Sequence, residues 1–264
     1  MAVTNRAFDQ EQYAVRVPLW REALLLPEWL RLRTSPIFYG QGIARGNGAA
    51  VVTIPGFMCS DLYTGCLTNW LQRIGYRAYP SRIERNNDCL ETVLRRVLNT
   101  IEQAAAETGG KVHLIGHSLG GILARIATIQ QPERVASVLT LASPFRGVRA
   151  HPYILWLGRR VRTRVQSEDA PHCFTGFCPC PSVTALQSDW PASVPTWAIY
   201  TKTDGIVDWQ ACLNDDPTCN VEVAGTHVGL VFNAQVYRFI AERLAQTQLV
   251  SETRAFGWAG NSLR

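Results

Sequence analysis

The sequence of 264 residues lacks any apolar run near the ~20 residues that a membrane-spanning helix requires. Its first residues, Met1 to Tyr13, include Asp9 and Glu11 and no continuous apolar core, so no signal peptide is expected. As it stands the sequence therefore indicates a cytoplasmic protein, or a secreted one if a leader has been removed. Charged residues are also few, at 18% against 47% hydrophobic residues, and this balance is typical of a globular enzyme.

Lysine is nearly absent, since only Lys111 and Lys202 occur and arginine supplies the other basic residues. The 26 basic and 21 acidic residues leave a net charge of +5. No basic stripe carries interleaved aromatic side chains, so this charge does not indicate nucleic-acid binding.

The eight cysteines lack the paired C-x-x-C spacing of zinc sites, so a metal site is not expected. Cys212 and Cys219 flank the polar loop 213–218, a spacing that suits a disulfide. Disulfides are rare in cytosolic proteins, so the bridged and the reduced state both stay open.

Apolar strand patterns alternate with helical patterns from residue 49 onward. Strands are predicted at 49–54, 77–83, 111–115, 135–141, 196–201 and 221–223, and helices at 62–74, from 88 to near 109, at 119–127 and at 232–244. This rhythm predicts an α/β fold in one domain, residues 1–264, with a mostly parallel central sheet and helices on both faces.

The most informative motif is Gly116-His117-Ser118-Leu119-Gly120-Gly121, between the predicted strand 111–115 and an apolar helix. The pattern G-x-S-x-G in this setting is similar to the nucleophile elbow of α/β-hydrolases, a strained turn that lifts a serine hydroxyl clear of the sheet. Strand and helix approach so closely there that a side chain at Gly116 or Gly120 would collide. A glycine-rich turn without chemistry is the alternative.

Three segments depart from the alternation. Residues 1–45 form an N-terminal helical extension, in which 13–40 predict two short amphipathic helices joined at Pro27 and packed on the sheet edge. Weak contact with a membrane surface through the tryptophans and arginines there is the alternative. Residues 145–194 lack a clear strand and are interpreted as a cap over the serine turn. Residues 248–264 are interpreted as a loose tail.

A serine hydroxyl needs a base to take its proton and a carboxylate to orient that base. In α/β-hydrolases the chain order is serine, acid, histidine. Of the five histidines, only His227 follows a late predicted strand; the others precede or adjoin Ser118 or fall inside the cap: His113, His117, His151 and His172. His227 is therefore predicted to be the base.

Asp204 is the first carboxylate after the strand 196–201 and is the favoured acid, with Asp208 one turn further on as the alternative. The transition state also needs donors for the oxyanion. The backbone N–H groups of Leu119 and Phe57 are predicted for this role, with Met58 as the next choice for the second donor.

Four segments together resemble bacterial lipases and esterases of the α/β-hydrolase superfamily: Ile54-Pro55-Gly56-Phe57, the serine motif, Ser143-Pro144-Phe145-Arg146-Gly147 and Asp204-Gly205-Ile206-Val207. The resemblance covers about residues 50 to 245. It implies hydrolysis of carboxylic esters without a cofactor, through an acyl-enzyme on Ser118. Pro55-Gly56 stands where many relatives carry His-Gly.

The predicted function is therefore a serine esterase or lipase that acts on a small-molecule ester or a lipid, with Met58, Tyr153 and Trp156 as candidate substrate-binding residues. An acyltransferase would use the same three residues but pass the acyl group to an alcohol. A non-catalytic binding protein of the same fold is a third hypothesis, which the complete set of serine, acid and histidine disfavours.

Overall fold

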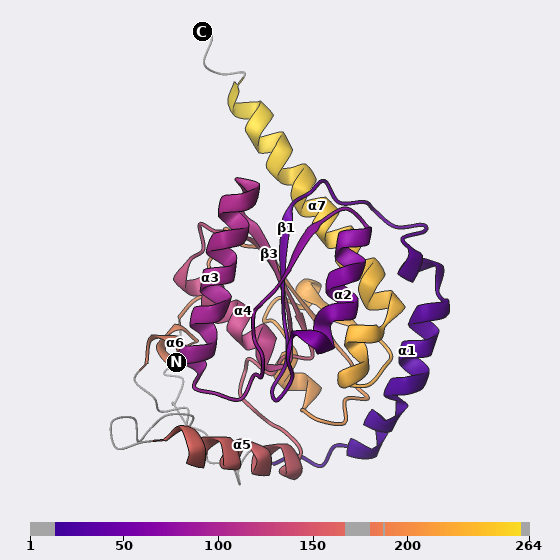
Figure 1. The fold of residues 1–264 in the computed structure, drawn as a ribbon, viewed down its shortest axis with the longest axis vertical. Helices are drawn as coiled ribbons and strands as arrows, with labels where there is room; N and C mark the ends of the chain where they lie inside the picture. Colours follow the sequence, from indigo (N-terminus) through magenta and orange to yellow (C-terminus); the bar gives the residue numbers. More distant parts are fainter. Residues whose placement is uncertain (1–13, 167–179, 187, 260–264) are drawn as a thin grey trace.

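The computed structural model describes residues 14–166, 180–186 and 188–259, and within them a sheet of six parallel strands forms the centre of the molecule (Figure 1). The strands run β2-β1-β3-β4-β5-β6 across the sheet. Their bounds are β1 Ala50–Ile54, β2 Arg77–Pro80, β3 Val112–His117, β4 Val135–Leu141, β5 Thr196–Tyr200 and β6 Asn220–Glu222. The expected mostly parallel sheet is confirmed, and every pairing described is parallel.

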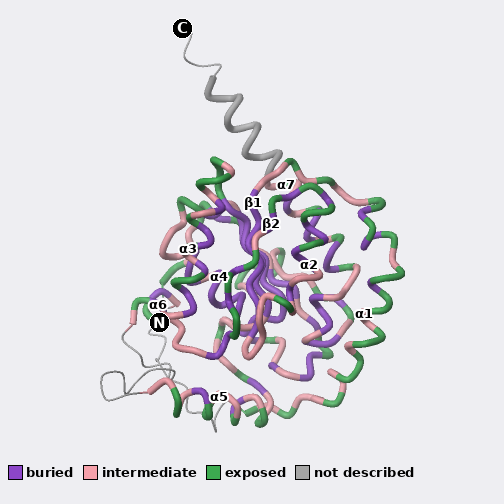
Figure 2. Tube along the Cα trace, viewed as in Figure 1, coloured by how far each residue is buried: buried purple, intermediate pink, exposed green. Residues whose placement is uncertain are grey.

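Helices cover both faces of this sheet, as the alternation predicts. Helices α2 (Asp61–Arg73) and α7 (Ala234–Ala259) pack on one face, and α3 (Leu90–Thr108) and α4 (Leu119–Gln130) on the other. Successive strand residues point to opposite faces, so Val51 joins the core under α2 and α7 while Val52 joins the core under α3 and α4. Burial on both sides explains why the central strands read as continuous apolar runs (Figure 2).

The second strand is shorter than its sequence suggests. It was expected over 77–83 but ends at Pro80, where the missing N–H of proline cannot continue the hydrogen-bond ladder. Residues Ser81 and Ile83 instead donate their backbone N–H groups to the carboxylate of Asp61, at 3.2 and 3.0 Å.

The N-terminal segment contains a 3-10 turn, η1 (Leu19–Leu24), followed directly by helix α1 (Leu25–Thr34) and a second turn, η2 (Pro36–Tyr39). The expectation of two helices joined at Pro27 is wrong. Pro27 lies in the first turn of α1, where its missing N–H has no helical partner to lose. Its packing also differs from the expected sheet edge, because α1 lies against the turn η5 (Val228–Phe232).

The cap consists, in its described part, of helix α5 (Pro152–Val165) and the short helix α6 (Pro181–Ala185). Its root at Ala150 is held on two sides. The N–H of Val15 donates to the carbonyl of Ala150 at 3.0 Å, and Ala150 forms an antiparallel bridge with Val207. The extended segment at Val15, the start of the cap and the loop after β5 are thus connected by backbone hydrogen bonds.

The closing helix α7 is longer than the pattern predicts. It continues to Ala259, so the expectation of a loose tail from residue 248 is wrong as far as that residue. Nucleating a helix is unfavourable in free energy, whereas each residue added to an existing helix gains a hydrogen bond. The packed first turns of α7 therefore favour its continuation. Residues 260–264 lie outside the described part, as do residues 1–13 of the extension and 167–179 and 187 of the cap.

Cys212 and Cys219 are separate thiols rather than a disulfide. The Cys212 thiol contacts the carbonyl of Asp208 at 4.0 Å, and the Cys219 thiol contacts the carboxylate of Asp216 at 3.7 Å. Two reciprocal hydrogen bonds close this loop instead: Asn214 N–H donates to the Asn220 side chain at 2.7 Å, and the Asn220 amide donates back to the carbonyl of Asn214 at 3.0 Å.

Two features are absent from the described residues. No helix among them is long and apolar enough to span a bilayer. The described residues also contain no cluster of three or more histidine, cysteine, aspartate or glutamate side chains that could bind a metal ion.

Candidate active site

Ser118 lies on the sharp turn between β3 and α4, with φ 51° and ψ −121°. A residue with a side chain rarely adopts this positive φ, so the turn is strained as the motif predicts. The Ser118 N–H donates to the carbonyl of Leu141 at 2.8 Å, which fixes the turn to the end of β4. A Cβ on Gly116 would overlap the backbone of Gly120, and one on Gly120 would overlap the carbonyl of Ile54, so both glycines are required by close packing.

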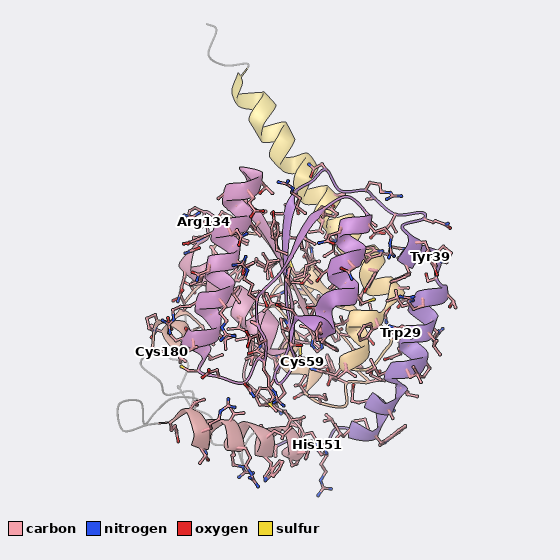
Figure 3. The ribbon with its side chains drawn as sticks, in the orientation of Figure 1. Trp29, Tyr39, Cys59, Arg134, His151 and Cys180 are labelled. Carbon is pink, nitrogen blue, oxygen red and sulfur yellow. The ribbon has the colours of Figure 1, made fainter. Side chains whose placement is uncertain are left out.

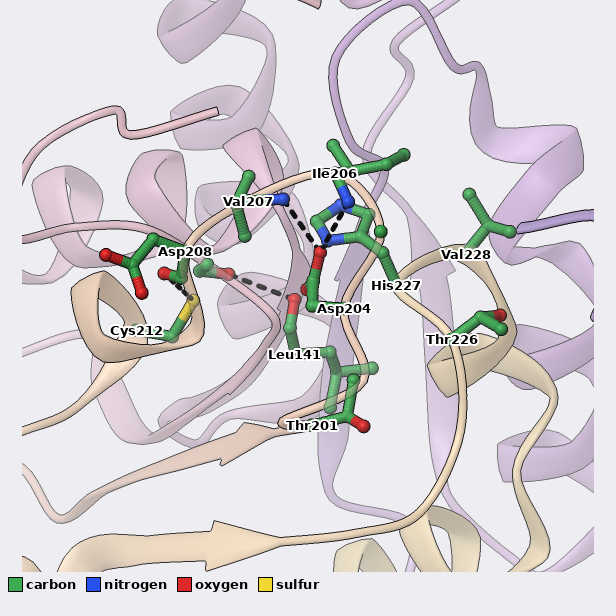
Figure 4. Close-up of polar contacts among 12 residues, drawn as sticks. Leu141, Thr201, Asp204, Ile206, Val207, Asp208, Cys212, Thr226, His227 and Val228 are labelled. Carbon is green, nitrogen blue, oxygen red and sulfur yellow. Dashed lines mark hydrogen bonds and ion pairs between the residues drawn. The ribbon is translucent and has the colours of Figure 1, made fainter. Parts of the chain in front are cut away.

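The predicted acid and base form a buried pair (Figure 4). The Nδ1–H of His227 donates to Oδ2 of Asp204 at 2.7 Å, and both side chains are almost completely buried. The other oxygen of Asp204 accepts the backbone N–H groups of Ile206 and Val207, at 2.8 and 2.7 Å. The carboxylate is thereby locked by three donors, and it holds His227 in the tautomer whose Nε2 can accept a proton.

Asp208, the alternative acid, does a different job. Its carboxylate lies 3.3 Å from the guanidinium of Arg149 and accepts the N–H of Gln210, which caps the turn η3 (Trp209–Cys212). Of the two candidates, the structure pairs only Asp204 with His227.

Opposing effects act on the pKa of His227. Burial alone would lower it, but the charge and hydrogen bond of Asp204 and the charge of Glu22 outweigh burial, so the pKa is raised above that of an ordinary histidine.

His117 shows the opposite result, since burial lowers its pKa to about 3 and the ring is neutral. Its Nε2–H donates to the backbone carbonyl of His227 at 2.9 Å.

A cavity of about 250 Å³ opens beside the elbow, beneath the cap. The side toward the sheet is lined by Gly56, Phe57, His117, Ser118, Leu119 and His227, and the cap side by Val148, Ile154, Leu155, Gly158, Val183 and Leu186. Cys59 and Cys180, also in the lining, are labelled in Figure 3. The structure therefore brings the predicted nucleophile, base and both predicted oxyanion donors to one largely apolar cavity.

Three residues expected to bind substrate lie elsewhere. Tyr153 and Trp156 stack on each other on the outer face of α5, with 52% and 44% of their surface exposed, and do not line the cavity. The helix turns about 100° per residue, so the face toward the cavity carries Ile154, Leu155 and Gly158 instead. Met58 also lies outside the lining.

The backbone hydrogen bonds around Met58 indicate whether its N–H group can serve as an oxyanion donor. The Met58 N–H donates to the carbonyl of Asn86 at 2.8 Å, and the Asn86 amide donates to the carbonyl of Pro55 at 2.8 Å. The Met58 N–H is therefore already engaged, which counts against Met58 as the second donor. Gly56 is also required, because a Cβ there would lie 2.9 Å from Nδ1 of His117.

Sequence reasoning missed the residues that hold the histidine loop from outside. Tyr63 donates its hydroxyl to the carbonyl of Val228 at 2.6 Å, and Glu22 and Glu28 of the N-terminal segment accept backbone N–H groups of the same loop. No motif marks these residues, because they lie far from the loop in sequence. Gly205 and Gly229 are the nearest to a signal, since both leave room for a carboxylate.

Known proteins resemble this chain in sequence and in fold. The family described as PGAP1-like alpha/beta domain matches residues 78–170. A triacylglycerol lipase of Burkholderia plantarii is 31% identical over 127 residues, which cover 45% of this chain and 36% of that lipase. A triacylglycerol lipase of Pseudarthrobacter phenanthrenivorans is 31% identical over 106 residues, 37% of this chain and 33% of its own length. The matched segments thus span about a third of each relative.

Among solved structures, the lipase BlEst2 of Bacillus licheniformis in its mature form superposes with a TM-score of 0.53 at 17% identity, covering 77% of this chain and 94% of that one. This likeness bears on the fold alone, because the identity is low. Together with the parallel sheet and the strained serine turn, it confirms the fold that the sequence predicts.

Proposed function

We propose that this chain, which has the α/β-hydrolase fold and resembles bacterial lipases and esterases, is a serine hydrolase of carboxylic esters. The observation that carries the proposal is the meeting of Ser118, on its strained turn, and the buried His227–Asp204 pair at one apolar cavity. This combination supplies a nucleophile, a base of fixed tautomer and room for an acyl group.

In the proposed reaction, Nε2 of His227 takes the proton of Ser118 as Oγ attacks the ester carbonyl carbon. The backbone N–H groups of Leu119 and Phe57 receive the negative charge that develops on the carbonyl oxygen, each contributing about 3 kcal/mol to the lowering of the barrier. The imidazolium then gives its proton to the departing alkoxide, which leaves an acyl-enzyme on Ser118. A water molecule, deprotonated by His227, releases the acid and restores the serine.

The lining of the cavity indicates the substrate class. Ile154, Leu155, Val183 and Leu186 of the cap face the space beside Ser118, and apolar side chains of this kind hold acyl chains better than charged groups. The proposed substrate is therefore a small-molecule ester or lipid with an apolar acyl group.

A rate series on p-nitrophenyl esters, from acetate to palmitate, tests the proposal. Ser118→Ala is expected to reduce kcat by about 10⁶-fold, because the nucleophile is lost. Ser188→Ala, at an exposed serine, is the matched control and should leave the rates unchanged. An organophosphonate should label Ser118 in the unaltered protein. Absence of hydrolysis and of labelling would favour a non-catalytic binding protein instead.

Acyl transfer to an alcohol is the second candidate, supported by the apolar character of the same cavity. It shares every step up to the acyl-enzyme and differs in the acceptor. Reactions with a short alcohol added to the buffer separate the two, because a transferase forms mainly the new ester and a hydrolase forms mainly the free acid.

Weak contact with a lipid surface also remains part of the proposal. Trp20 and Leu26 of the N-terminal segment expose 71% and 64% of their surface, and the net charge is positive. Binding to anionic vesicles that declines with added salt, and that Trp20→Ser weakens, is the expected result.

A further inference from the structure

The loop that carries His227 is held by two carboxylates from the N-terminal segment. Glu22 accepts three backbone N–H groups: Oε1 those of Gly205 and His227, at 2.9 and 3.1 Å, and Oε2 that of Val228, at 2.9 Å. Gly205 follows the acid Asp204 directly. One side chain therefore connects the acid loop to the base loop, although it lies on neither.

Glu28, two helical turns further along the same segment, extends this contact by one residue. Its Oε1 accepts the N–H of Thr226 at 2.8 Å, and its Oε2 accepts the hydroxyl of the same residue at 2.6 Å. Three consecutive loop residues, 226 to 228, thus donate their backbone N–H groups to Glu22 or Glu28.

The surrounding backbone is shaped for these carboxylates. A Cβ on Gly205 would lie 2.7 Å from Oε1 of Glu22, and one on Gly229 would overlap Oε2 of Glu28. Both positions therefore admit the carboxylate because they are glycine.

The carbonyl side of the loop is held from the opposite direction. His117 donates Nε2–H to the carbonyl of His227 at 2.9 Å, and Tyr63 donates its hydroxyl to the carbonyl of Val228 at 2.6 Å. At both residues the N–H is held by Glu22 and the carbonyl by an aromatic side chain from the core. The position of the imidazole is therefore set by side chains of three distant elements rather than by a regular strand or helix.

We propose that Glu22 is the principal positioning residue of the Ser118–His227–Asp204 site, with Glu28 as its support. This inference rests on the proposed function for its catalytic consequence, but its structural part stands on the hydrogen bonds alone. Glu22 keeps the acid and base loops at a fixed separation, so that Nδ1 of His227 stays on Asp204 while Nε2 serves Ser118. Misplacement of a catalytic group by about 1 Å can reduce the rate by about 10²-fold.

The charge of Glu22 gives the residue a second effect. Asp204 and Glu22 are the acidic groups whose charges raise the pKa of His227 against burial. Two further groups that contact the loop, His117 and Tyr63, are neutral: burial lowers the pKa of His117 to about 3 and raises that of the Tyr63 hydroxyl well above its usual value. The carboxylate of Glu28 also faces the loop, at Thr226. Removing the charge of Glu22 should therefore lower the pKa of His227.

The variant Glu22→Gln tests both effects, because it keeps the shape but places an NH₂ group against a backbone donor. We expect kcat to fall by about 10²-fold with KM changed little, and the acid limb of kcat/KM to move to lower pH. Glu22→Asp retains the charge but is too short to reach both loops. It should therefore lower kcat with the acid limb in place, and it also serves as the second variant if Glu22→Gln folds poorly.

Glu102→Gln, at an exposed position on α3, is the matched control for loss of one carboxylate and should leave all three quantities unchanged. Circular dichroism and Tm verify that rates are compared per folded molecule. If Glu22 had only a structural role, Glu22→Gln would lower Tm but leave kcat within about twofold of the parent value and the acid limb at the parent's pH. That result would overturn the proposal.

A spectroscopic readout separates this proposal from the proposed function. The Nδ1–H proton of His227, bonded to Asp204, should give a downfield proton resonance in the unaltered protein that shifts or broadens in Glu22→Gln. An unchanged resonance would refute the positioning role even in an active enzyme. If the unaltered protein hydrolyses no ester, the function fails, and the resonance still decides whether Glu22 positions the histidine.

Discussion

Asp204 and Asp208 make a matched pair for testing which carboxylate serves His227. Asp204→Asn should reduce kcat by about 10⁴-fold, as in other serine triads, because an amide can stabilise the wrong tautomer of the imidazole. Asp208→Asn removes only the charge that meets Arg149, and its amide oxygen can still cap the short turn, so kcat should change by less than about tenfold. Steady-state kinetics on one ester measure both. A larger loss in Asp208→Asn would contradict the assignment.

The pH dependence follows from the raised pKa of His227. Only the neutral imidazole can accept the proton of Ser118. A raised pKa keeps His227 protonated up to a higher pH than an ordinary histidine, so kcat/KM should begin to fall at a higher pH as the solution is acidified. The profile of kcat/KM against pH measures this limb. A limb at or below the position of an unperturbed histidine would contradict the balance of charges described above.

At the residue scale, the sequence predicts what lies close to a motif. Ser118 and His227 could be found from a pattern and from the small number of histidines, and both line the cavity. Choosing Asp204 over Asp208 required geometry, because both follow the same strand. Glu22 could not be found at all, since its contacts lie 183 to 206 positions away along the chain.

Among the elements, the close approach of α4 to the end of β1 at Ile54 permits a direct test of packing. Gly120→Ala should lower the free energy of unfolding by about 1–3 kcal/mol. The added Cβ would overlap the carbonyl of Ile54, and a backbone atom cannot move aside as a flexible side chain can. Gly110→Ala is the control, since a Cβ there meets nothing within 4 Å. Its stability should change by less than about 1 kcal/mol. Urea denaturation measures both, and equal losses would contradict the packing described.

Element types follow from the sequence more readily than element ends or partners. The apolar runs of β1 and β3 are typical of strands buried on both faces, and the structure has them there. The end of β2 depends on Pro80, and the length of α7 depends on continuation from a packed first part. Tertiary packing determines which face of α5 meets the cavity. The sequence pattern does not contain this information, so Tyr153 and Trp156 were wrongly predicted to bind substrate.

For the whole molecule, a single cooperative unfolding transition is expected. The two main cores lie on opposite faces of the same strands, so neither can lose its packing while the sheet remains intact. Scanning calorimetry should give a calorimetric enthalpy equal to the van't Hoff enthalpy. Two resolved transitions would show that residues 1–264 do not behave as one domain.

The contact between Glu22 and His227 joins positions 205 residues apart along the chain. Glu22 is translated well before the histidine whose backbone it holds. Closing so long a loop adds a slow, late event to folding. Nascent chains stopped before residue 227 would lack both the proposed base and the backbone N–H groups that Glu22 accepts, so they should show no turnover.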